Sequence, residues 1–238
     1  MKILLVNDDG IEAEGIHLLE RILCKIYQHN IEIVIYAPAK GIKGSSRALT
    51  LGEGKEVKVK KVGEQRYTVY GTPADCVEIA CRVEKSVEII FSGINHGWNL
   101  GVGDFYLSGT IQAAQHGVQY FGIPAVALSA PESMIFSRKL KKYTEKVLRK
   151  ILVHKHTKGL ININLPESGF RGSKVVQLGC YRAIGGLKEV REKWDTKLYN
   201  LLNPMNIMEH CGENPNTDVG AIQNGYVAIT LHDGAEFF

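Results

Sequence analysis

An apolar run at residues 3–6 ends at Asn7 and is followed by the paired acids Asp8 and Asp9. The run shows no alternation of apolar and polar residues, which predicts a strand buried on both faces of a parallel sheet. In open α/β sheets, ligands bind outside the carboxyl ends of the strands, where these two carboxylates would lie. A chain that starts on such a strand is therefore expected to adopt an α/β architecture with a site at this edge.

Two interpretations of the acid pair remain open from this stretch alone. Adjacent carboxylates repel each other unless a cation or a shared proton relieves the repulsion, and a divalent metal with oxygen ligands does so. The alternative is a polar turn, Asp8-Asp9-Gly10, that precedes a helix.

Strand-like and helix-like segments alternate along most of the chain. Thr72 has the form of a helix N-cap, with Pro73 at the first helical position. Such alternation predicts an α/β fold with a mostly parallel sheet. The predicted strands cover 31–37, 87–91, 125–129 and 160–165, and the predicted helices cover 14–26, 76–83, 110–121 and 135–152.

Other segments depart from this rhythm. Residues 55–62 and 65–70 are predicted to form a β-hairpin that projects from the main sheet. Residues 39–50 form a loop rich in Gly, Ser and Lys, of the kind that lines active sites. Beyond residue 170 only 175–178 and 226–231 resemble strands. We therefore expect a core at 1–170 that carries the active site, and an extension at 171–238 that serves as an oligomerisation arm and supplies a returning strand.

Charge and length exclude several function classes. The net charge is +4, but residues 138–158 carry a local charge of +8 and the remainder carries −4. This local excess favours a solvated helix face over a surface for a nucleic-acid polymer. The apolar stripe of this predicted helix, 135–152, consists of Phe136, Leu140, Tyr143, Val147 and Ile151. No run approaches the ~18 apolar residues of a membrane span, and no secretory signal is expected.

The cysteines favour a reducing compartment. They are odd in number, form no Cys-x-x-Cys pair and mostly lie in apolar runs, which predicts core thiols in a cytoplasmic protein. They are Cys24, Cys76, Cys81, Cys180 and Cys211.

Three strand ends converge in this topology: Asp8-Asp9, the loop 39–50, and residues 92–99 after the strand that ends at Phe91. Asn95 adds a neutral oxygen donor to the two carboxylates. Mg²⁺ or Mn²⁺ takes few protein ligands and keeps several waters, so this set suffices for one divalent cation. Zinc is disfavoured, because His154 and His156 lie in a basic loop and not with the acids.

Ser108-Gly109-Thr110 leads directly into a predicted helix. Backbone N–H groups at a helix start, with two hydroxyls and a glycine, suit a phosphate, although an ordinary N-cap explains the same residues. A hard metal beside a phosphate cradle is typical of a phosphomonoesterase. The chain has no P-loop, no G-x-S-x-G elbow and no G-x-G-x-x-G after its first strand.

With these motifs in hand, the sequence resembles the survival protein SurE family of metal-dependent 5′/3′-nucleotidases, and the resemblance spans nearly the whole chain. The segments that carry it are VNDDGIEAEGI at 6–16, YAP at 36–38, LTL at 49–51, YGTPADCV at 70–77, FSGINHGWNLG at 91–101, SGTIQAAQHG at 108–117 and, more loosely, NTDVGAIQNGYVAIT at 216–230.

The resemblance implies a Rossmann-like core whose sheet carries helices on both faces, with a C-terminal extension that exchanges between subunits of a dimer or tetramer. It implies hydrolysis of nucleoside 5′(3′)-monophosphates to nucleoside and phosphate. Asp8, Asp9 and Asn95 would bind the metal. Asn99 and the Ser108-Gly109-Thr110 helix start would line the phosphate pocket.

One departure from the family pattern concerns the metal. The family's fourth ligand is a serine, and the aligned residue here is Lys43. A protonated lysine does not ligate Mg²⁺, so Ser45, Ser46 or a water would fill the position while Lys43 contacts phosphate. Alternatively, the chain is a weakly active or non-catalytic nucleotide- or phosphate-binding homologue. Ala39 stands at a usual aspartate, and the role of His232 is open.

Overall fold

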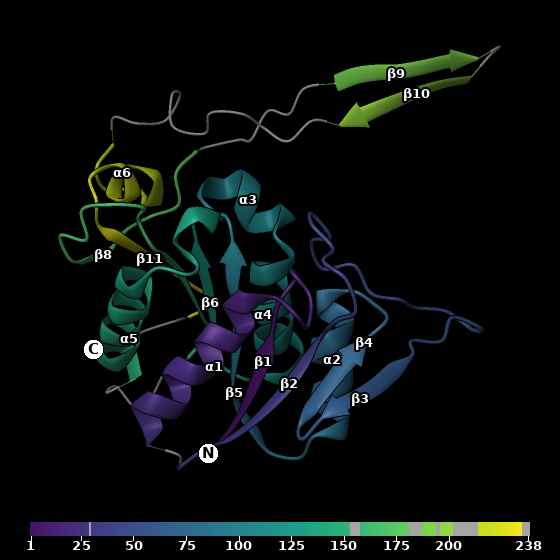
Figure 1. Ribbon diagram of the computed structural model, residues 1–238, viewed down its shortest axis with the longest axis horizontal. Helices are drawn as coiled ribbons and strands as arrows, with labels where there is room; N and C mark the ends of the chain where they lie inside the picture. Colours follow the sequence, from purple (N-terminus) through teal and green to yellow (C-terminus); the bar gives the residue numbers. More distant parts are fainter. Residues whose placement is uncertain (29, 153–157, 181–186, 194–195, 202–213, 235–238) are drawn as a thin grey trace.

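The computed structural model describes residues 1–28, 30–152, 158–180, 187–193, 196–201 and 214–234. A nine-stranded sheet forms its centre, with the strand order β3-β4-β2-β1-β5-β6-β7-β11-β8. Figure 1 shows helices on both faces of this sheet. The strands are β1 (Lys2–Val6), β2 (Glu32–Pro38), β3 (Val59–Gly63), β4 (Arg66–Val69), β5 (Val87–His96), β6 (Ala125–Ala130), β7 (Leu160–Asn164), β8 (Ser173–Val175) and β11 (Val227–His232).

The centre of the sheet is parallel, as the alternating pattern predicts. β1 pairs in parallel with β2 on one side and with β5 on the other, and β6 and β7 continue in the same direction. The exceptions lie toward the edges, where β3 runs antiparallel to β4 and β11 antiparallel to β7. The carboxyl ends of β1, β2, β5 and β6 therefore share one edge.

Two apolar layers sandwich the sheet. Ile3 and Leu5 of β1 point into one layer, and Leu4 and Val6 point into the other, all fully buried. The first layer packs under α1 (Glu14–Tyr27) and α5 (Arg138–Leu152), and the second packs under α2 (Pro73–Val83) and α4 (Gly109–Phe121). The continuous apolar run at the start of the chain follows directly from burial on both sides.

The start of α2 confirms the predicted cap. Thr72 accepts a hydrogen bond from the backbone N–H of Asp75, and the Asp75 carboxylate accepts one from the backbone N–H of Thr72, which makes a capping box with Pro73 in the first turn. Such a box satisfies two N–H groups that the helix itself leaves unpaired.

Three sequence predictions are wrong in detail. β5 does not end at Phe91 but continues to His96, because Asn95 and His96 pair with Ser129 and Ala130 of β6. The hairpin at 55–70 forms an edge of the main sheet, since β4 pairs with β2. Phe136 is not on the apolar stripe of α5, because it precedes the helix and its exposed fraction is 83%.

Several features were not predicted. α3 (Gly101–Leu107), the short helix η1 (Glu132–Met134) and α6 (Asp218–Gln223) join the expected elements. β9 (Leu187–Lys193) and β10 (Thr196–Leu201) form an antiparallel hairpin that Figure 1 shows apart from the nine-stranded sheet. His154 and His156 lie outside the described residues, as does Cys211.

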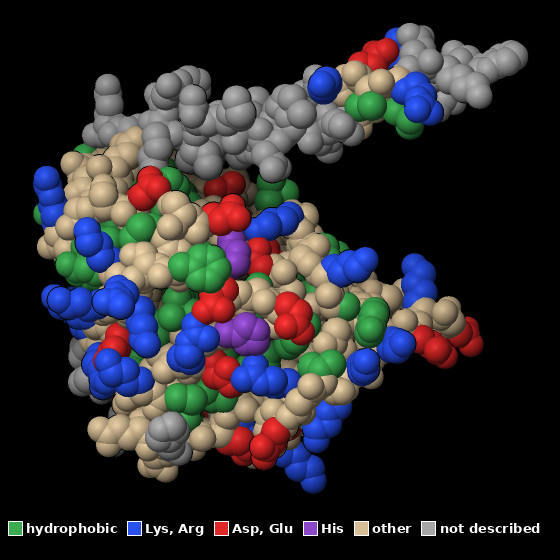
Figure 2. All heavy atoms as spheres, in the orientation of Figure 1, with side chains coloured by type: hydrophobic (Ala, Val, Ile, Leu, Met, Phe, Trp, Pro, Cys, Tyr) green, Lys and Arg blue, Asp and Glu red, His purple; other side chains and the backbone are tan. Residues whose placement is uncertain are grey.

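The basic surface of α5 agrees with the sequence, whereas the predicted burial of the cysteines is found only in part. Figure 2 shows Lys and Arg side chains gathered over α5. No helix in the described part of the chain is both long and apolar enough to cross a membrane. Of the cysteines described, Cys76 is buried, Cys24 and Cys81 are half-buried and Cys180 is exposed, and all four are free thiols.

Candidate functional site

A tight turn carries the chain out of β1. The Asn7 side chain donates to the carbonyl of Gly10 at 2.8 Å and accepts from its N–H at 3.2 Å. Gly10 has a φ of +104°, a conformation that glycine adopts without strain. The backbone N–H of Ile42 donates to the Asp8 carbonyl at 2.8 Å, so the loop that follows β2 lies against this turn.

Each acid has a different set of partners. Asp8 is almost fully buried, and its Oδ1 accepts a hydrogen bond from the Thr110 hydroxyl at 2.6 Å. Burial raises the pKa of the Asp8 carboxyl, an effect that the Thr110 hydroxyl opposes. Asp9 Oδ1 pairs with the Lys43 ammonium at 2.6 Å, and Asp9 Oδ2 accepts the backbone N–H of His96 at 2.9 Å.

Asn95 lies beside the acids near the end of β5. Its amide nitrogen donates to the Gly97 carbonyl at 2.9 Å, which fixes the orientation of the side chain. Its Oδ1 is buried and has no hydrogen-bond partner among the described residues. A buried acceptor without a partner costs free energy, so this oxygen indicates a ligand that would bind it.

The start of α4 closes another side of the site. Ser108 is the N-cap and accepts the N–H of Ile111 at 3.1 Å, while Thr110 holds Asp8. Gly109 packs closely against Ser45 and Asp8. A Cβ at this position would lie 2.7 Å from Ser45 Oγ and 3.1 Å from Asp8 Oδ2. The glycine therefore permits the helix start to approach the acid pair.

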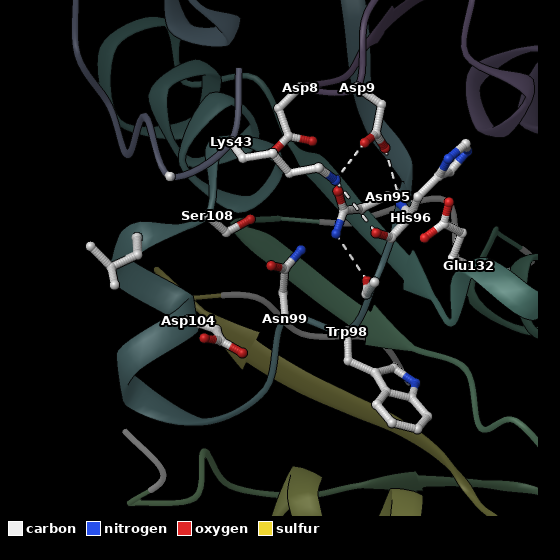
Figure 3. Close-up of a pocket in the computed structure, with 13 residues that line it drawn as sticks. Asp8, Asp9, Lys43, Asn95, His96, Trp98, Asn99, Asp104, Ser108 and Glu132 are labelled. Carbon is white, nitrogen blue, oxygen red and sulfur yellow. Dashed lines mark hydrogen bonds and ion pairs between the residues drawn. The ribbon is translucent and has the colours of Figure 1, made fainter. Parts of the chain in front are cut away.

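These groups share one pocket of about 480 Å³, within the usual range for a small-molecule site. Figure 3 shows Asp8, Asp9 and Asn95 directed toward a common region, with Lys43 reaching across it. Among the predicted site residues, Gly109 and Thr110 lie behind the pocket wall. The lining residues are Asp8, Asp9, Lys43, Gly44, Asn95, His96, Gly97, Trp98, Asn99, Asp104, Leu107, Ser108 and Glu132.

Side chains outside the pocket lining, Ser129 and Asp75, hold Asn99 and the loop that carries Lys43 in place. The Asn99 amide nitrogen donates to the Ser129 hydroxyl at 2.8 Å, which ties it to β6. The Asp75 carboxylate accepts both the backbone N–H and the hydroxyl of Thr50, at 2.8 and 2.7 Å. Asp75, which belongs to the capping box of α2, thus also anchors the far end of the loop that carries Lys43.

Some lining residues escaped the sequence analysis. Glu132 follows β6, whose carboxyl end lies at the same edge of the sheet as those of β1 and β5. The expectation that ligands bind at this edge could therefore have identified it. Asp104 comes from α3, a helix that the sequence did not predict. His96 and Trp98 lie within a motif that was noticed, but only its asparagines were assigned roles.

Asp104 titrates in an unusual range. Burial, helped by the charge of Asp218, raises the pKa of its carboxyl from the ordinary 3.8 to about 6, although the hydrogen bond that its Oδ2 accepts from the Leu100 N–H opposes the shift. A raised pKa in the folded state means that the folded chain holds this proton more tightly than the unfolded chain. The contribution of Asp104 to the free energy of unfolding is therefore fully present below about pH 4, and it is lost as the pH rises through about 6.

The Asp104→Asn variant keeps an acceptor for Leu100 and removes the titration. We expect it to be more stable than the wild type by about 2 kcal/mol at pH 7.5, and equally stable at pH 3.5. Urea unfolding of both proteins at the two pH values measures this difference. A difference that does not change with pH would contradict the assignment.

The donor set fits a hard divalent cation. Asp8 Oδ2, Asp9 Oδ1 and Asn95 Oδ1 are all oxygens, and the last is buried with no hydrogen-bond partner among the residues that the structure describes. Within the described ranges no three His, Cys, Asp or Glu side chains come together as a metal site, so the amide and water would have to complete this one. Mg²⁺ and Mn²⁺ accept such a set, whereas zinc prefers nitrogen and sulfur.

Of the two serines that the sequence offers as replacement ligands, Ser46 is engaged elsewhere. Its hydroxyl donates to the Tyr106 carbonyl at 2.7 Å. Ser45 Oγ is buried, has no partner in the described part of the chain, and lies on the Gly109 side of Asp8.

The fold and the pocket together define a Rossmann-like α/β protein with an oxygen-donor site at the carboxyl ends of its parallel strands. Comparison with known proteins identifies the family. Residues 3–183 match the family model described as survival protein SurE. The chain belongs to this family.

Relatives align with it over almost their full length. Two proteins named 5′-nucleotidase SurE, from Histophilus somni strain 2336 and Caldanaerobacter subterraneus, are each 34% identical; the alignments cover 97% and 96% of this chain and 91% and 89% of the relatives. The crystal structure of the SurE protein from Aquifex aeolicus superimposes with a TM-score of 0.74 at 31% identity, covering 97% of this chain and 92% of that one.

Proposed function

We propose that this protein is a divalent-metal-dependent phosphomonoesterase that hydrolyses nucleoside 5′(3′)-monophosphates to nucleoside and phosphate. The observation that carries the proposal is the convergence of three oxygen donors, Asp8, Asp9 and Asn95, beside the start of α4 in one pocket. Its relatives are named 5′-nucleotidases, which supports the substrate class.

In this proposal Asp8, Asp9 and Asn95 hold one Mg²⁺ or Mn²⁺. When bound, the cation would supply a Lewis acid for the phosphoryl oxygens and a means of activating water. Thr110 fixes Asp8, and the His96 N–H fixes Asp9, so the carboxylates keep their orientation before substrate arrives. Such preorganisation avoids a reorganisation cost during reaction.

Other residues of the pocket bind the phosphate. Ser108 lines the pocket at the start of α4 and offers its hydroxyl there, beside the positive end of the helix dipole. The Lys43 ammonium supplies a positive charge between Asp9 and Asn95, and Asn99 contributes a side chain held in place by Ser129. The pocket is thereby equipped to stabilise charge that develops on the phosphoryl group.

Phosphate release from 5′-AMP, 3′-AMP and other nucleoside monophosphates tests the proposal. We expect release with Mn²⁺ or Mg²⁺, its loss when EDTA removes the metal, and its recovery with excess Mn²⁺. Phosphate release that is undiminished by the chelator, or absent with every nucleotide, would refute it.

The proposal includes a homodimer or tetramer in a reducing, cytoplasmic compartment. The β9–β10 hairpin pairs with no other described strand, and an isolated two-stranded hairpin is marginally stable in water. Exposed Val190, Leu198 and Tyr199 on the hairpin would be covered in an exchanged arm. Light scattering of the full chain measures the oligomeric state.

A further inference from the structure

The three candidate ligands share one arrangement. Each uses one polar atom to bind the protein: Asp8 Oδ1 accepts from Thr110, Asp9 Oδ2 accepts from the His96 N–H, and the Asn95 nitrogen donates to Gly97. The second polar atom of each side chain is an oxygen. These second oxygens are the atoms available to a cation.

One of these oxygens already has a cationic partner. The Lys43 ammonium lies 2.6 Å from Asp9 Oδ1 and 3.4 Å from the His96 carbonyl oxygen. Figure 3 shows the ammonium group between Asp9 and Asn95. The N–H of Ile42, the residue before Lys43, donates to the Asp8 carbonyl, and this hydrogen bond holds the backbone of Lys43 beside the acid pair.

The two partners of this ion pair differ in exposure. The Lys43 side chain is 63% exposed and the Asp9 side chain only 7%. Lys43 therefore leaves the pair at little cost, since its ammonium regains water, whereas the carboxylate of Asp9 has little access to water and is stabilised by whichever cation lies beside it.

We propose that Lys43 is an internal competitor of the divalent cation for Asp9, and that the two cations exchange on this carboxylate. Binding of the metal releases the Lys43 ammonium into the pocket, where it contacts the phosphate of the substrate. Metal and phosphate are thus coupled through Lys43, and each increases the affinity for the other. This inference rests on the proposed function and adds a mechanism for ordered assembly of the site.

Direct measurement of Mn²⁺ binding tests the competition. The Lys43→Met variant keeps the apolar length and removes the charge, and Lys40→Met, on the exposed part of the same loop, is its matched control. In electron paramagnetic resonance titrations of the full chain with Mn²⁺ alone, we expect Lys43→Met to bind about fivefold more tightly than the wild type, equivalent to about 1 kcal/mol. Lys40→Met should match the wild type.

A second titration, with inorganic phosphate present, tests the coupling. Phosphate should raise the Mn²⁺ affinity of the wild type by a larger factor than that of Lys43→Met. An unchanged or weaker Mn²⁺ affinity in Lys43→Met, or an equal effect of phosphate on both proteins, would overturn the inference.

Turnover measured in parallel separates the two proposals. A wild-type protein that binds Mn²⁺ and shows the Lys43 effect, but hydrolyses no nucleoside monophosphate, would refute the proposed function and support the exchange. Hydrolysis together with identical Mn²⁺ binding in wild type and Lys43→Met would support the function and refute the exchange.

Discussion

The Asp8→Asn variant is expected to lose about 1,000-fold in the rate of phosphate release from 5′-AMP at saturating Mn²⁺. Asparagine keeps an oxygen for the Thr110 hydroxyl, so the local geometry survives. It removes the negative charge of the most buried of the proposed ligands, and the loss of one fixed electrostatic group from such a site costs about 10²–10³ in rate. Initial rates of phosphate release measure the effect.

This loss should not come from unfolding. Because burial raises the pKa of Asp8, its charged form opposes folding at neutral pH when no metal is bound, and a neutral side chain does not. We therefore expect the metal-free variant to melt at the same temperature as the wild type or higher. Asp233→Asn, outside the pocket lining, serves as the control with wild-type rates. A rate for Asp8→Asn within tenfold of the wild type would remove Asp8 from the catalytic site.

The second large effect is structural. Gly15, in the first turn of α1, packs directly on β5, and a Cβ there would lie 2.0 Å from the Ile94 carbonyl oxygen and 3.1 Å from His96 Nε2. The Ile94 oxygen belongs to the backbone of a central strand, so no side-chain rotation relieves the clash. The Gly15→Ala variant should therefore lose about 3 kcal/mol in the free energy of unfolding.

The same substitution should also disturb the site. The Gly15 N–H donates to His96 Nε2 at 3.2 Å, and Asn95 lies between the two residues of β5 that the methyl group would displace. Urea unfolding measures the stability. Gly122→Ala is the matched control, because that position has a φ of +66° but open space, so only about 1 kcal/mol of backbone strain is expected. Equal losses in the two variants would show that helix α1 accommodates the methyl group.

Much of the fold was predictable because its signals are local. The run from Ile3 to Val6 is buried on both faces, and the Thr72 cap starts α2 at the expected residue. The extension of β5 to His96 was not predictable in this way, since residues 92–96 are mostly polar or glycine and become a strand by pairing with β6. α3 escaped because two glycines in seven residues weaken its helical signal.

The site was predictable to the extent that it follows from topology. The carboxyl ends of parallel strands lie at one edge of a sheet, which predicts that Asp8, Asp9 and Asn95 lie close together. In the structure all three line one pocket. The ion pair of Lys43 with Asp9 was not predicted, because it depends on one backbone hydrogen bond, from Ile42 to Asp8, that fixes the loop in register with the turn. The sequence shows that a lysine is present but not which carboxylate it meets.

The position of β11 sets an order of events during synthesis. β11 lies between β7 and β8 in the sheet, yet it follows both along the chain. A nascent chain that has emerged only through β8 therefore presents β7, all five residues of which are buried in the finished protein, as an open edge. Such an edge invites pairing with other chains. One wall of the pocket also waits for β11, because Leu100, next to Asn99, packs against Ala228 of that strand. The acid pair at the end of β1 is therefore translated first, and its surroundings are completed by the last strand of the sheet.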